Sequence, residues 1–89
     1  MIEIGISSSF TRVFRKRIAG NKDAESAFWS RMELFTENPF NPLLRCHKLK
    51  GNLEGLWSFS VTYDIRVIFQ FLGEEKALLI DIGSHDEVY

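Results

Sequence analysis

The sequence predicts an α+β fold in which an N-terminal strand and an antiparallel helical hairpin precede a four-stranded antiparallel meander packed on the helices. Apolar residues recur at helical spacing in the first half of the chain and alternate with polar residues in the second half. Short turns separate the later segments, which favours antiparallel neighbours whose shared apolar face the helices must cover. Because the chain has only 89 residues, we expect positions 1–89 to form a single domain.

The first half begins with a predicted strand over residues 1–6, where apolar residues alternate weakly with others. The serines at 7–9 can cap a first helix, because a hydroxyl accepts a hydrogen bond from an unpaired backbone N–H. The sequence Gly20-Asn21 ends this helix. A second helix has Asp23 as its candidate N-cap, runs to about Glu37 and carries one apolar stripe, which consists of Ala24, Phe28, Met32 and Phe35.

The second half predicts short strands. Residues 38–44 hold both prolines and form an ordered loop, and residues 47–49 are a candidate short strand. Alternation predicts strands over 57–63, 65–71 and 77–82, with a hairpin turn at 73–76. Residues 83–89 are expected to form a polar tail that ends in an aromatic residue.

Composition excludes several classes of protein. Apolar residues make up 45% of the chain and aromatic residues 13%, which excludes intrinsic disorder, and no apolar run approaches the length of a membrane span. The single cysteine, Cys46, cannot form an internal disulfide, and no signal peptide fits the start, so we expect a reduced, cytoplasmic protein. Two histidines are too few for a convincing metal site, and we expect neither a metal nor another cofactor.

Charge is distributed unevenly although the formal net charge is only −1. Residues 1–50 carry a net +4 and residues 51–89 a net −5. This polarity is compatible with a basic face for a nucleic acid, and equally with two ordinary solvated surfaces. We expect the cations of the first helix to be solvated, although such a face could contact RNA. They are Arg12, Arg15, Lys16 and Arg17.

No phosphate-binding loop, dinucleotide fingerprint, nucleophile elbow or zinc-protease motif occurs, so candidate chemistry depends on single residues. Strand alternation places Arg66 opposite the apolar face, where its guanidinium could hold a phosphate and stabilise developing charge. The alternative is an exposed arginine paired with Asp64 or Glu54. His85 could act as a general acid or base, or it could be a solvated histidine of the tail.

Other candidates are less specific. His47 is flanked by Arg45, Lys48 and Lys50, which could together clamp a nucleic-acid backbone or simply protect a charged edge strand. Asp64 fits a turn former as well as a catalytic group. The terminal Tyr89 could stack on a base or anchor the chain end.

Five segments together resemble the RelE/ParE superfamily of toxin–antitoxin toxins, in its RelE and YafQ-like branch. They are Asn38–Phe40, His47–Gly51, Leu56–Ser58, Asp64–Phe69 and Ile82–Tyr89. The resemblance covers nearly the whole chain. It implies an endoribonuclease that cleaves mRNA on the ribosome by metal-free acid–base attack of the 2′-hydroxyl on the adjacent phosphate. It also implies a cognate antitoxin as partner.

The resemblance also implies roles for residues. Arg66 would bind phosphate and stabilise the transition state, and His85 would be the general acid or base. Asp64 and His47 would take part in proton transfer or its organisation, and Tyr89 would orient or stack on the substrate base. Two other functions remain open on the same fold, namely ParE-like inhibition of DNA gyrase and a non-catalytic module that binds an antitoxin.

Overall fold

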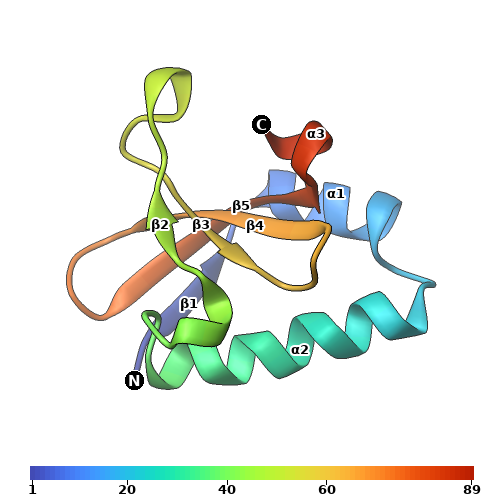
Figure 1. Cartoon of the computed structure of the whole chain (residues 1–89), viewed down its shortest axis with the longest axis horizontal. Coiled ribbons are helices and arrows are strands. Elements are labelled where there is room, and N and C mark those ends of the chain that lie inside the picture. Colours follow the sequence, from blue (N-terminus) through green and yellow to red (C-terminus); the bar gives the residue numbers. More distant parts are fainter.

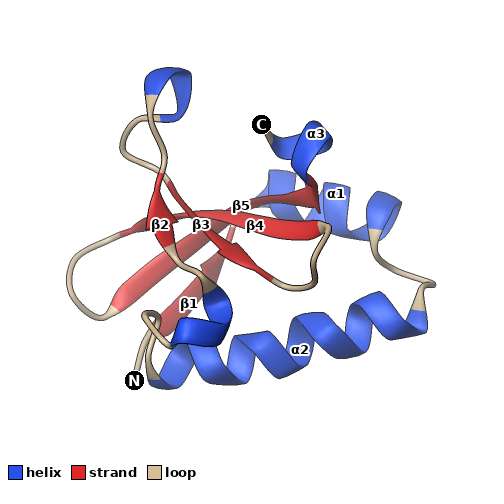
Figure 2. Cartoon of the chain, in the orientation of Figure 1, coloured by secondary structure: helices blue, strands red, loops and turns tan.

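The computed structural model describes residues 1–89 as a five-stranded mixed sheet with two helices on one face and a short helix on the other (Figure 1). The predicted α+β class is confirmed. Figure 2 shows the elements by type. In chain order they are β1 (Glu3–Ile6), α1 (Ser8–Arg17), α2 (Lys22–Glu37), the 3-10 turn η1 (Pro42–Leu44), β2 (His47–Lys48), the 3-10 turn η2 (Gly51–Leu53), β3 (Trp57–Ser60), β4 (Ile65–Phe71), β5 (Lys76–Ser84) and α3 (His85–Val88).

The strands lie in the order β1-β5-β4-β3-β2. Strands β2 to β5 form the predicted antiparallel meander, and β1 adds a fifth strand by pairing in parallel with β5, with Glu3 opposite Lys76. A parallel pair needs a long crossover, which here runs through both helices and the meander itself. The register places Arg66 of β4 between Ser60 of β3 and Gly83 of β5.

The core lies between the helices and one face of the sheet. Phe35 of α2 is fully buried, with its ring stacked on Phe59 at 4.8 Å between centroids and edge-on to Phe69 at 4.9 Å. Each of the four residues of the predicted α2 stripe is buried. A 3.6-residue repeat therefore located the buried face of this helix correctly.

Two helix caps were predicted, and the structure confirms one of them. Ser7 Oγ accepts a hydrogen bond of 3.0 Å from the Phe10 backbone N–H, as expected for the cap of α1. The prediction that Asp23 caps α2 is wrong, because Asn21 accepts the hydrogen bond from Ala24 N at 3.1 Å. Asp23 instead lies in the first turn, where a negative charge is favourable beside the unpaired N–H groups.

Two predicted segments have different boundaries. The strand expected over 57–63 ends at Ser60, because the Val61 N–H bonds Ile65 O at 2.8 Å and closes a turn that leaves Tyr63 90% exposed. The expected polar tail is also wrong. Strand β5 continues to Ser84, and residues His85–Val88 form α3, which packs over the face of the sheet opposite α2 (Figure 1).

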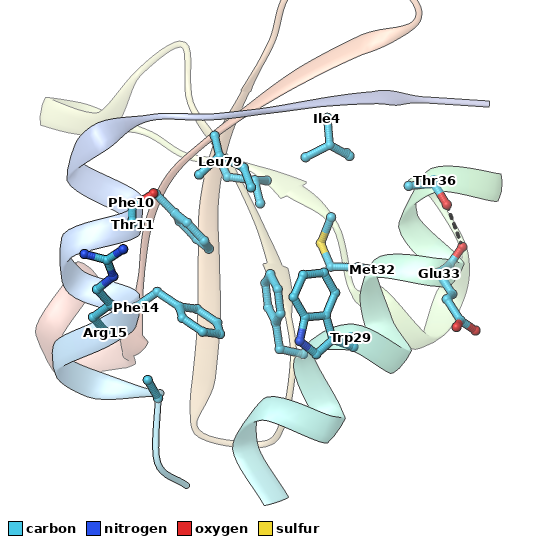
Figure 3. A pocket seen from close by; sticks show the side chains of 13 residues that line it. Ile4, Phe10, Thr11, Phe14, Arg15, Trp29, Met32, Glu33, Thr36 and Leu79 are labelled. Carbon is cyan, nitrogen blue, oxygen red and sulfur yellow. Dashed lines mark hydrogen bonds between the residues drawn. The ribbon is translucent and has the colours of Figure 1, made fainter. Parts of the chain in front are cut away.

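The two long helices contact each other through aromatic rings but leave a groove between them. The Phe28 ring lies 5.9 Å from that of Phe10 and 5.1 Å from that of Phe14. Beside these rings, α1, α2 and β1 enclose an apolar groove of about 610 Å³, with Trp29 60% exposed at its side (Figure 3). None of the helices has the length and apolar character needed to cross a membrane.

Candidate functional site

The face of the sheet opposite α2, called the open face below, carries several of the predicted residues. Val67 and Phe69 of β4 point into the core. Because successive residues of a strand point to opposite faces, Arg66 and Ile68 lie on the open face. Their neighbours across the strand pair, Ser60 and Ser58, share that face. The expected orientation of Arg66 therefore agrees with the register.

The Arg66 guanidinium is held by the turn between β3 and β4. Its Nη1 donates hydrogen bonds to Thr62 O at 2.9 Å and to Tyr63 O at 2.8 Å. The alternative in which Arg66 pairs with Asp64 or Glu54 is not seen, because the ion pairs of the chain involve other residues. Carbonyl groups thus fix the guanidinium without neutralising it, and its charge remains available to an anion.

His85 is the first residue of α3, and its side chain is 69% exposed. Its Nδ1 lies 3.7 Å from a carboxylate oxygen of Asp86. The imidazole also meets the Tyr89 ring edge-on, with 4.5 Å between centroids. An exposed imidazole that is oriented by an aromatic ring and lies near a carboxylate can exchange protons with a bound substrate.

Tyr89 anchors the end of the chain. Its hydroxyl donates a hydrogen bond of 2.5 Å to Oγ of Ser58, which is fully buried. Of the two roles considered for Tyr89, the structure shows the anchor, while 41% exposure leaves part of the residue open to a ligand.

His47 shares the open face because it pairs with Ser58 in the sheet register. Its Nδ1 lies 3.0 Å from the backbone oxygen of Arg45. The neutral ring would donate through Nδ1 here, which leaves Nε2 as a proton acceptor. The open face therefore carries His47, Ser58 and Arg66 on the strands, with His85 of α3 and Tyr89 directly after this helix.

Three predicted site residues lie elsewhere. Lys48 pairs with Trp57 and places its Nζ 5.5 Å from that ring, so it lies on the face of the sheet opposite His47. Lys50 is exposed just before η2, away from Arg66. Asp64 is exposed in the turn before β4, and its carboxylate has no hydrogen-bond or ion-pair partner.

Arg45 lies closer to Arg66 than its sequence position suggests. It follows η1 in a left-handed conformation with φ of 51°, and it lines a hollow with Arg66 beside the end of β3. His85 is not among the residues that line this hollow. Arg66 thus faces the hollow on its Ser60 side and the start of α3 on its Gly83 side.

Arg17 was expected to be a solvated cation, and this prediction is wrong. Its Nη1 lies 3.2 Å from Asp81 Oδ1 and donates to Ile82 O at 3.0 Å, while its Nε lies 3.5 Å from Glu87 Oε2. These contacts tie α1 to β5 and α3. Arg17 therefore belongs to the residues that position His85, and its guanidinium lies on the open face, beside Asp81 and Gly83 of β5.

Glu87 completes this attachment through a capping box. Ser84 N–H donates to Glu87 Oε1 at 2.7 Å, and Glu87 N–H donates to Ser84 Oγ at 3.3 Å. The hydrogen bond from the Ser84 backbone, supported by its hydroxyl and by Arg17, lowers the pKa of Glu87. The spacing Ser84-x-x-Glu87 was the signal in the sequence that could have revealed α3.

The structure places no three His, Cys, Asp or Glu side chains together as candidate metal ligands. Burial raises the pKa of the Cys46 thiol to about 11, which keeps it protonated and unreactive at neutral pH.

The arrangement defines a class of small α+β proteins, with a mixed sheet, two helices on one face and a short C-terminal helix returning over the other. No family model matches the chain, and no curated protein matches its sequence. Solved structures of toxins share its fold along nearly the whole chain.

A metal-bound toxin from Helicobacter pylori is 26% identical with a TM-score of 0.75, each chain being covered over 100% of its length. YafQ from E. coli is 17% identical with a TM-score of 0.74, covering 100% of this chain and 99% of YafQ. YoeB in a YoeB–YefM complex from Staphylococcus aureus is 16% identical with a TM-score of 0.74, covering 96% of this chain and 98% of that one. The chain thus has the fold of the RelE/ParE superfamily toxins, as the resemblance predicted.

Proposed function

We propose that this protein is the toxin of a type II toxin–antitoxin system and acts as an endoribonuclease on mRNA at the ribosome. The observation that supports this most is the position of Arg66 opposite Gly83, two residues before His85, on the open face of a toxin fold. Arg66 has no carboxylate partner, and the exposed imidazole of His85 lies on the same face of the sheet, two residues beyond the strand partner of Arg66.

The proposed reaction is transesterification within the RNA. The 2′-oxygen attacks the adjacent phosphorus, the bond to the 5′-oxygen breaks, and the products carry a 2′,3′-cyclic phosphate and a 5′-hydroxyl. One group must remove the 2′ proton and another must protonate the leaving oxygen. We assign these two transfers to His47 and His85, and stabilisation of the added negative charge to Arg66.

This assignment gives Asp64 a lesser role than the family resemblance implies. Its carboxylate lies in the exposed turn before β4, and nothing in its surroundings orients it toward His85. Tyr89, by contrast, is held against the His85 ring and remains 41% exposed. We therefore keep Tyr89 as the residue that orients the substrate base and treat Asp64 as a turn residue.

Contact with the ribosome would involve a second surface. Arg12, Arg15 and Lys16 are exposed on α1 and line a shallow depression together with Ser8 and Thr11. Three cations on one helix face can bind the phosphate backbone of ribosomal RNA without reading its sequence. This patch reconciles the acidic net charge with binding to a polyanion.

The proposed partner is an antitoxin, as in the YoeB–YefM complex. The apolar groove between α1, α2 and β1 would hold an apolar segment of it (Figure 3). Arg15 at the side of the groove favours a segment that also carries carboxylates. Such a partner would cover Trp29 and Ile6, which are 60% and 54% exposed in the free chain.

In vitro translation followed by primer extension tests this function. The purified protein should introduce new 5′ ends into a translated mRNA, and none should form when initiation is blocked. A parallel supercoiling assay with DNA gyrase distinguishes the alternative on the same fold. Inhibition of gyrase with intact mRNA would overturn the ribonuclease assignment, and an inactive protein that still binds an antitoxin would favour the non-catalytic module.

A further inference from the structure

A hollow of about 340 Å³ lies beside the end of β3, between η1, α2 and the turn that leads to β4. Three arginines from separate parts of the chain line it, namely Arg31 of α2, Arg45 after η1 and Arg66 of β4. The remaining lining residues include Ser60, Thr62 and Tyr63 and no carboxylate. The pairing of β2 with β3 covers Trp57 and Ser58, so Phe59 and Ser60 at this end of β3 have no strand partner on that side.

Each arginine is held by the backbone or left without a partner. Arg31 Nε donates to Val61 O at 3.3 Å, and Arg66 Nη1 donates to Thr62 O at 2.9 Å. Arg45 is exposed, and its guanidinium makes no hydrogen bond or ion pair. Three cations therefore border one hollow with no counter-charge from the protein, which is unfavourable until an anion enters.

The place of the hollow relative to His85 indicates which anion it receives. Along the open face, Arg66 stands between Ser60, which lines the hollow, and Gly83, which leads into α3 and His85. A phosphate between Arg66 and His85 and a second phosphate in the hollow would thus be successive phosphates of one RNA chain. Serine and threonine hydroxyls beside the guanidinium groups suit phosphate oxygens.

We propose that this hollow binds a phosphate of single-stranded RNA next to the one that is cleaved, and that Arg31 is an RNA-binding residue. The inference rests on the proposed ribonuclease function for the identity of the ligand. It adds a residue of α2, which the sequence did not single out, to the substrate contacts. It also gives the enzyme a substrate contact that takes no part in the proton transfers.

Fluorescence anisotropy with a labelled 2′-O-methyl RNA pentanucleotide tests the proposal, because this probe binds but cannot be cleaved. Arg31→Gln removes the charge and retains a donor for Val61 O. We expect it to weaken binding about tenfold and to lower the magnitude of the salt slope by about one. The control Lys76→Gln removes one positive charge at the start of β5, outside the hollow, and should bind as wild type. Thermal unfolding of both variants checks their folding.

Pentanucleotides with one neutral methylphosphonate linkage locate the phosphate. One linkage should weaken binding to wild type without further weakening binding to Arg31→Gln, which identifies the charge that Arg31 contacts. Equal losses in Arg31→Gln and Lys76→Gln, no loss in either, or no binding by wild type would overturn the proposal. If the wild-type protein fails to cleave mRNA but binds the probe in a way that depends on Arg31, the ribonuclease function alone is rejected.

Discussion

Tyr89 and Ser58 connect the last residue of the chain to the middle of the sheet, through a hydrogen bond of 2.5 Å to a hydroxyl that is fully buried. Val88, one residue earlier, is also buried. Helix α3 is thus fastened on its inner side by Tyr89 and on its outer side by the ion pair of Arg17 with Glu87. The exposed His85 lies between these two attachments, and its position depends on both.

The hydrogen bond between Tyr89 and Ser58 predicts the effect of Tyr89→Phe. This change leaves the buried Ser58 hydroxyl without its partner and should lower the free energy of unfolding by about 1–3 kcal/mol. Urea unfolding measures it, with Tyr63→Phe as the control, because Tyr63 is 90% exposed. Adding Ser58→Ala to Tyr89→Phe should recover part of the loss, and equal losses in the two single tyrosine variants would contradict the role of this bond.

Arg17 should matter for the attachment of α3 more than for global stability. Its ion pairs are partly exposed, so Arg17→Gln should lower the free energy of unfolding by only about 1 kcal/mol. Hydrogen exchange of the Tyr89 amide, which bonds His85 O at 3.0 Å, should accelerate clearly more than exchange in β4. Arg12→Gln is the control, and unchanged exchange in Arg17→Gln would show that the ion pairs do not hold α3.

Gly83 permits the close approach of Arg17 and Glu87 to the strand. A Cβ at this position would lie 2.8 Å from Arg17 Nη1 and 2.8 Å from Glu87 Oε1. Gly83→Ala should therefore displace the ion pair and lower the free energy of unfolding by about 1–3 kcal/mol. In the control Gly5→Ala, the nearest atom is Leu78 Cδ1 at 3.4 Å, and the loss should be smaller. The reverse order in thermal unfolding would refute this packing argument.

Glu87 predicts a dependence of stability on pH. Hydrogen bonding by the Ser84 backbone lowers the pKa of Glu87 below its usual value of 4.5 in the folded protein. The folded state therefore binds this proton less readily than the unfolded state, and the stabilisation is present above the usual pKa and is lost as the pH falls through the lowered one. Glu87→Gln should lose stability relative to wild type at pH 7, and the difference should shrink toward pH 2. A difference independent of pH, or the same profile in Glu74→Gln, would contradict this.

Much of the fold followed from periodicity, because a period of two or of 3.6 residues determines which face a side chain occupies. That argument placed Arg66 on the open face and the Phe35 stripe in the core. It also explains why Lys48 lies on the face opposite His47. Proximity to His47 in sequence suggested a common site, whereas adjacent residues of a strand point to opposite faces.

The residues that position His85 could not be found from local patterns. Arg17 meets Asp81, which lies 64 positions away, and only the pairing of β1 with β5 brings the end of α1 beside that strand. Arg31 was missed for the same reason, since its contact with Val61 crosses from α2 to the turn after β3. Alternation alone does not indicate that this turn begins at Val61.

Cleavage of mRNA on stalled ribosomes under single-turnover conditions tests the central claim most directly, namely that Arg66 and His85 act on one phosphodiester. Arg66→Gln and His85→Gln should each slow cleavage at least about 100-fold with unchanged thermal unfolding. The control Lys76→Gln, at the far end of β5, should cleave at the rate of wild type. Cleavage at the wild-type rate by either site variant would contradict the account.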